Sequence, residues 1–161
     1  MLASELKVNQ FLVQYCRILV QDIADERLAE QPLPGVNHPA WILGHLAVTA
    51  DRAIRVLGSS PELPTTWTPL FGPGSKLSAI RTDYPAKDEL LGAVEQSFER
   101  LRQQTASATA EQLSQPSANR LTKNALPTVE DGIAFLLTGH LGIHLGQLST
   151  WRRMIGLPPL F

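Results

Sequence analysis

Apolar side chains recur at steps of three and four residues along four long segments of the chain, and no long segment alternates apolar and polar residues. Steps of three and four place apolar side chains on one face of an α-helix, whereas strict alternation would predict a β-strand. We therefore predict helices over residues 3–29, 39–57, 86–105 and 128–155. Four amphipathic helices of this length predict an all-α fold, a four-helix bundle forming one domain over residues 1–161.

Short polar residues and a proline mark where these helices begin. Thr128 is predicted to cap the last helix, and Thr109 a short additional turn, because a hydroxyl group accepts a free backbone N–H there. Pro39 suits the first turn of the second helix, and Asn37 is the predicted cap before it.

Residues 59–85, between the second and third helices, are rich in proline, glycine, serine and threonine. Loops longer than about 15 residues are usually either functional or disordered. This loop also carries Trp67, Phe71 and Tyr84. Three aromatic side chains predict that part of the loop packs against the bundle.

The bulk composition narrows the class of protein. With 43% hydrophobic and 18% charged residues, the chain is predicted to be globular, and a net charge of −1 argues against nucleic-acid binding. No apolar run reaches the roughly 18 residues of a membrane span, and the N-terminus lacks a signal-peptide pattern. The single cysteine, Cys16, excludes an intrachain disulfide and is predicted to be a core residue. We therefore predict a cytoplasmic protein without nucleic-acid or membrane partners.

Three of the four histidines interrupt apolar helical faces. His140 and His144 lie four residues apart on the stripe of the last helix, and His45 lies between bulky apolar residues of the second. An imidazole buried without a partner costs about 1–3 kcal/mol, so three inward-facing histidines indicate a common partner. Residues four apart share a helical face, where a single metal ion can bridge them. We therefore interpret His45, His140 and His144 as ligands of one divalent metal ion.

Glycines flank all three histidines within their helices. Gly44, Gly139, Gly142 and Gly146 each cost about 0.5–1 kcal/mol relative to alanine in a helix interior. We interpret them as places where helix backbones approach closely and bring the imidazoles together. His38 precedes a proline and is predicted to be exposed and outside the site. Gln147 is interpreted either as a residue of the site or as a solvated side chain.

The ligand set predicts the metal and its chemistry. Three neutral imidazoles suit zinc or nickel, with iron, manganese or copper as alternatives, and they leave a coordination position open for catalysis. The Glu-x-x-His motif of di-iron bundles and the His-Glu-x-x-His motif of zinc proteases are both absent. No general base is evident, because Asp51, six residues after His45, is predicted to face elsewhere.

Two motifs resemble those of a known family. The segments Trp41-Ile-Leu-Gly-His-Leu-Ala and His140-Leu-Gly-Ile-His-Leu-Gly-Gln-Leu resemble the second-helix and last-helix motifs of the DinB/YfiT superfamily. The resemblance implies an up-down-down-up bundle, often a homodimer, with a metal ion on His45, His140 and His144. It also implies chemistry like that of relatives that are S-transferases using bacillithiol or mycothiol, or a mycothiol-dependent maleylpyruvate isomerase.

Three functions remain open on the sequence alone. The first is a metal-dependent S-transferase that joins a low-molecular-weight thiol to a small-molecule substrate in detoxification. The second is a metal-dependent hydrolase that uses a bound hydroxide. The third is a non-catalytic bundle that binds a metal ion or a small ligand.

Overall fold

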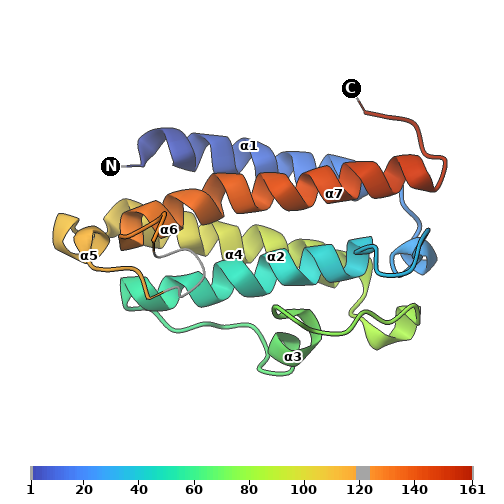
Figure 1. Cartoon of the computed structure of the whole chain (residues 1–161), viewed down its shortest axis with the longest axis horizontal. Coiled ribbons are helices and arrows are strands. Elements are labelled where there is room, and N and C mark those ends of the chain that lie inside the picture. Colours follow the sequence, from blue (N-terminus) through green and yellow to red (C-terminus); the bar gives the residue numbers. More distant parts are fainter. Residues whose placement is uncertain (1, 119–123, 161) are drawn as a thin grey trace.

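The computed structural model describes residues 2–118 and 124–160, and every regular element in those ranges is helical. Four long helical segments form the bundle of Figure 1: α1 (Ala3–Val20), α2 (Pro39–Ala53), α4 (Lys87–Ser107) and a last helix that combines α6 (Val129–Phe135) with α7 (Leu141–Met154). The predicted all-α four-helix bundle is confirmed. Among the described helices, none is long and apolar enough to cross a membrane.

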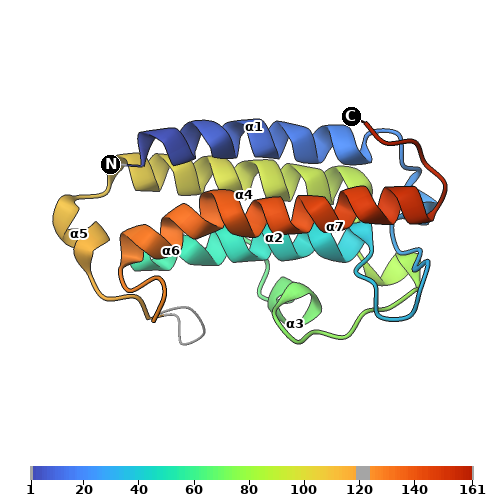
Figure 2. The same ribbon diagram turned by 45° about the horizontal axis from the view of Figure 1, so that its top comes forward.

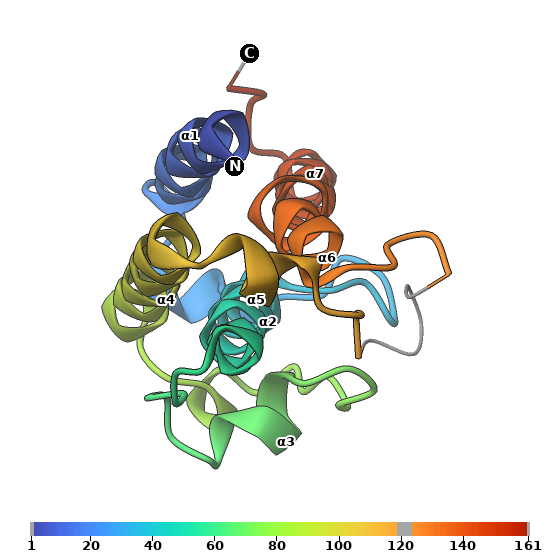
Figure 3. The same ribbon diagram turned by 90° about the vertical axis from the view of Figure 1, so that its left-hand side faces the viewer.

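The direction of the helices explains the long connection between α2 and α4. Figures 1 and 2 show α1 and α7 running one way and α2 and α4 running the other way. The two parallel helices α2 and α4 pack extensively against each other, so the chain must return along the bundle between them. The end-on view of Figure 3 shows α1, α2, α4 and α7 around one core, with α3 (Trp67–Phe71) outside α2.

The returning segment is anchored at both ends and covers α2. The side chains of Trp67, Phe71 and Tyr84 are buried, which confirms that part of this loop packs against the bundle. Near its start, the carboxylate of Asp51 accepts the backbone N–H groups of Glu62 and Leu63 and pairs with Arg100. Asp51 therefore holds the loop and faces away from the histidines, as predicted.

Helix α1 is shorter than predicted, because it ends at Val20 rather than near residue 29. The chain then turns through a 3₁₀ segment, η1 (Asp25–Arg27), where the Asp25 carboxylate accepts the backbone N–H of Lys87 at the start of α4. Leu28 still lies in the core. The apolar residues beyond Val20 keep a helical spacing because they are buried, although the backbone there is no longer α-helical.

His38, and not Asn37, caps α2. The backbone N–H of Trp41 donates to His38 Nδ1 at 3.2 Å, so the proton of the neutral ring lies on Nε2, which is 3.2 Å from the hydroxyl oxygen of Tyr84. Burial lowers the pKa of His38 to about 4, and the side chain has no exposed surface. The predictions of an Asn37 cap and an exposed His38 are therefore wrong, because the loop residue Tyr84 folds over this helix end.

The last helix has the predicted extent but an unpredicted irregularity. Its start at Thr128 carries a capping box with Asp131, and Thr109 caps the short helix α5 (Ala110–Ser114), both as predicted. Between α6 and α7 lies one turn of π-helix, η4 (Leu136–His140). This turn ends on one of the candidate metal ligands.

Cys16 is expected to be inert in the folded protein. Burial raises the pKa of its thiol to about 12, so the reactive thiolate is scarce at mildly alkaline pH. Iodoacetamide is expected to leave the native chain unmodified and to alkylate one site in denaturant, as measured by intact mass. Rapid labelling of the native protein would contradict the buried position of Cys16 in α1.

Candidate metal centre

The structure brings together the three histidines that the sequence singled out. His45 lies in the middle of α2, His140 ends the π-turn, and His144 lies one turn into α7. One ring nitrogen from each side chain lies within 4.8 Å of the others. The ring centroids are 4.7 to 5.3 Å apart. The side chains therefore converge from two helices on a single point.

Hydrogen bonds on the outer side of two rings decide which nitrogen faces this point. His45 Nδ1 lies 2.7 Å from the carbonyl oxygen of Phe71, to which it donates. His144 Nδ1 lies 3.1 Å from Gln147 Oε1 and donates to it. In both rings the lone pair is consequently on Nε2, the nitrogen left to bind a metal ion. Such outer partners fix the tautomer and the orientation of metal-bound histidines.

His140 differs from the other two histidines on its outer side. Its Nδ1 is buried and has no hydrogen-bond partner among the described residues, and its Nε2 lies 3.3 Å from His45 Nε2. His45 Nε2 carries a lone pair, so this contact is a hydrogen bond only when His140 carries its ring proton on Nε2. That tautomer leaves the buried lone pair of His140 Nδ1 without a partner in the described part of the chain. A divalent ion bound by all three rings would take the inward lone pairs in place of this bond, so the residues present fit a metal ion.

The three imidazoles are neutral at physiological pH. Burial lowers the pKa of His45. Burial and the neighbouring His45 lower the pKa of His140 to about 4, and burial with both other histidines lowers that of His144 to about 4. Metal binding requires the deprotonated ring. The lowered pKa values therefore keep all three histidines in the form that binds a metal ion.

The interpretation of the glycines near the histidines as places where helix backbones approach closely is wrong. A Cβ atom at Gly44 would lie 2.2 Å from the ring of Phe71, and one at Gly139 would lie 2.9 Å from the ring of Phe135. A Cβ at Gly142 or Gly146 would meet nothing within 4 Å. Gly44 thus makes room for an aromatic side chain of the loop, and the Phe71 carbonyl reaches His45 as a result.

Further residues complete the surroundings of the site. The indole of Trp41 stacks on His45 with ring centroids 4.6 Å apart, and its Nε1 donates to Ser75 Oγ at 2.7 Å. Asn37 Nδ2 donates to the same Gln147 oxygen that His144 contacts, at 3.1 Å. Gln147 therefore belongs to the site. Trp41 lies four residues before His45, a spacing that places both on one helical face, whereas no sequence signal points to Asn37.

The hydrogen-bond partners of the three histidines, within residues 2–118 and 124–160, are a backbone carbonyl, a side-chain amide and one another. No carboxylate is among the partners in those ranges.

Comparison with known proteins places the fold and the site in context. A family model described as the DinB superfamily matches residues 13–148, a range that includes all three histidines. The fold is similar to that of YfiT from Bacillus subtilis, described as "a probable metal-dependent hydrolase with an unusual four-helix bundle topology". The TM-score is 0.67 at 15% identity, over 96% of this chain and 87% of that chain. No curated protein matches the chain significantly.

Proposed function

Since this chain belongs to the DinB superfamily, we propose that it is a divalent-metal-dependent enzyme whose ion is held by His45, His140 and His144. The observation that carries the proposal is the convergence on one point of three neutral imidazoles, those of His45 and His144 buried and that of His140 half-buried. Zinc or nickel suits this ligand set best, with iron, manganese or copper as alternatives. When bound, the ion supplies Lewis-acid activation at the position that three ligands leave open.

We propose that the activated group is a low-molecular-weight thiol. A bound ion would lower the pKa of the thiol, so that a thiolate would form without a carboxylate base; none is among the hydrogen-bond partners of His45 and His144 in the described residues. With an organic halide as the electrophile, sulfur would bond to the carbon, the carbon–halogen bond would break and halide would leave with the electron pair, while the thiol proton would pass to solvent. Phe71 and Gln147 orient the imidazoles, and Trp41 covers one face of His45.

Hydrolysis is the second candidate, favoured by the description of YfiT as "a probable metal-dependent hydrolase". The same open position would take a water molecule, whose pKa falls toward 7 on zinc. The two reactions differ in their nucleophile, and this difference can be measured directly.

Activity assays with metal-loaded protein are expected to separate these candidates. The zinc and nickel forms are incubated with aryl halides, each with bacillithiol, mycothiol or glutathione, and with a panel of esters. Thiol transfer predicts product that requires both metal and thiol, and a loss of at least about 10³-fold in the His45→Ala variant. The Gly92→Ala variant, altered on α4 outside the site, serves as the folding control and retains the activity.

The alternative outcomes are distinct. Ester cleavage without thiol, at a rate that rises with pH through an ionisation that moves on metal exchange, would replace transfer by hydrolysis. Metal binding without either activity would leave a non-catalytic bundle and contradict the proposed enzyme.

A further inference from the structure

Asn9 is a fully buried polar side chain of α1 that bonds to the helix carrying His140 and His144. Asn9 lies on the core-facing side of α1, which otherwise buries Val13, Cys16 and Val20. Its Nδ2 donates to the carbonyl oxygen of Leu137 at 2.8 Å. An amide among apolar residues costs about 1–3 kcal/mol without partners, so this contact determines whether Asn9 is tolerated there.

The acceptor of this bond lies in the π-turn. In an α-helix each carbonyl accepts the N–H four residues later, whereas in a π-turn the bonds span five residues. Leu137, within η4 (Leu136–His140), accepts the side-chain N–H of Asn9 on its carbonyl oxygen. Asn9 thereby ties α1 to the irregular backbone of the turn.

The π-turn decides where His140 points. One added residue rotates the following helix by about 100° relative to the preceding one. The turn ends at His140, and α7, which carries His144, begins with the next residue. Both imidazoles come at or after the end of the turn, so the direction in which the His140–His144 pair faces, relative to α6, depends on this turn being formed.

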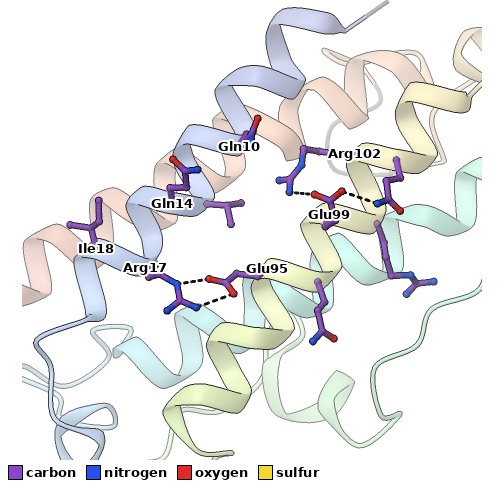
Figure 4. Close-up of a pocket in the computed structure, with 11 residues that line it drawn as sticks. Gln10, Gln14, Arg17, Ile18, Glu95, Glu99 and Arg102 are labelled. Atoms are coloured by element: carbon purple, nitrogen blue, oxygen red, sulfur yellow. Dashed lines mark hydrogen bonds and ion pairs between the residues drawn. The ribbon is translucent and has the colours of Figure 1, made fainter.

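Arg102 on α4 fixes the orientation of the Asn9 amide. Arg102 Nη1 donates to Asn9 Oδ1 at 2.7 Å, which leaves the NH₂ end of the amide to face Leu137. Arg102 is itself held by an ion pair with Glu99, and Figure 4 shows this pair beside the groove between α1 and α4. The chain of contacts thus runs from α4 through α1 to the last helix.

We propose that Asn9 and Arg102 are positioning residues for the metal centre: the buried Asn9 amide stabilises the π-turn that sets His140 and His144 against His45. The inference rests on the proposed metal site. It assigns a role in metal binding to two residues that do not contact the site.

The test compares three variants in two measurements. Asn9→Asp keeps the size of the side chain and the acceptor for Arg102 but places a carboxylate oxygen against the Leu137 carbonyl. Arg102→Gln removes the group that orients Asn9. Cys16→Ala is the control, since it perturbs the same buried face of α1 two turns further along. Zinc affinity is measured by chelator competition, and backbone amide exchange is measured on metal-free protein.

A positioning role predicts a specific pattern. Asn9→Asp lowers zinc affinity by about tenfold, the lower end of the effect of losing a group bonded directly to a metal ligand, because Asn9 acts through the turn; saturating zinc still binds one per chain. Arg102→Gln lowers the affinity less. Cys16→Ala changes the affinity by less than about twofold even where it lowers the melting temperature equally. In metal-free protein, the amides of His140 and Leu141 exchange about tenfold faster in Asn9→Asp than in Cys16→Ala.

Other results overturn the inference. Equal zinc affinity in Asn9→Asp and Cys16→Ala, with equal exchange at His140, would reduce Asn9 to a structural contact. If Asn9→Asp does not fold, Arg102→Gln decides by the same two measurements. If the parent binds no metal, the proposed function fails, whereas amide exchange around His140 still supports or refutes control of the π-turn by Asn9.

Discussion

Replacing Gly44 with alanine is expected to lower the free energy of unfolding by about 2–3 kcal/mol, the upper part of the usual range for forcing extra volume into a packed core. The added Cβ would lie 2.2 Å from two ring carbons of Phe71, a distance that real contacts do not reach. Phe71 is fully buried against α2, so its ring cannot turn away without moving the loop segment that carries it. Denaturant titration of the metal-free protein measures this loss.

The same substitution is expected to weaken metal binding. Moving Phe71 displaces the carbonyl oxygen that accepts from His45 Nδ1, and losing such an outer partner lowers metal affinity by about tenfold or more. The matched control is Gly92→Ala in the interior of α4, where a Cβ would meet nothing within 4 Å. That variant is expected to gain about 0.5–1 kcal/mol, because alanine favours a helix. Equal stability of the two variants would contradict the close packing of Phe71 on Gly44.

Replacing His140 with alanine is expected to abolish the stabilisation of the protein by zinc. At a free metal concentration of about 1,000 times its dissociation constant, one bound ion stabilises the parent by about 4 kcal/mol. Two remaining imidazoles do not retain an ion at that concentration. The metal-free variant stays within about 1 kcal/mol of the parent, because the loss of the contact with His45 Nε2 is offset by removal of Nδ1, which is buried and has no partner among the described residues. Thermal unfolding with and without zinc measures both effects.

His38→Ala provides the control for this experiment. His38 is also a buried histidine, but its ring caps α2 and contacts Tyr84 rather than the cluster. Its loss is expected to cost about 1–2 kcal/mol, as for other helix caps, and to leave the response to zinc intact. A response to zinc that survives in His140→Ala and disappears in His38→Ala would reverse the assignment of the site.

The sequence is most informative where burial and periodicity coincide. Polar residues on an apolar helical face are costly, so the spacing of apolar residues is enough to single out His45, His140 and His144. The helices of the bundle are predictable for the same reason. The end of α1 is not, because Ile23 and Leu28 continue the apolar spacing into a segment whose backbone is no longer α-helical.

The surroundings of the site depend on tertiary contacts that no local pattern encodes. The partner of His45 is a backbone carbonyl 26 residues away, and any residue could supply it. The burial of His38 depends on the loop that covers it, whose path no periodicity indicates. The π-turn arises within a segment of ordinary helical spacing, and its stabilising contact comes from Asn9, 128 residues before Leu137.

The most direct test of the metal centre is the metal content of untagged protein purified without chelator. The account predicts about one equivalent of a divalent metal ion per chain, zinc or nickel above the others, taken up again after removal and absent from the His45→Ala and His140→Ala variants. A parent chain that carries no metal and takes up none when zinc or nickel is added would contradict it, and the three histidines would then be core residues.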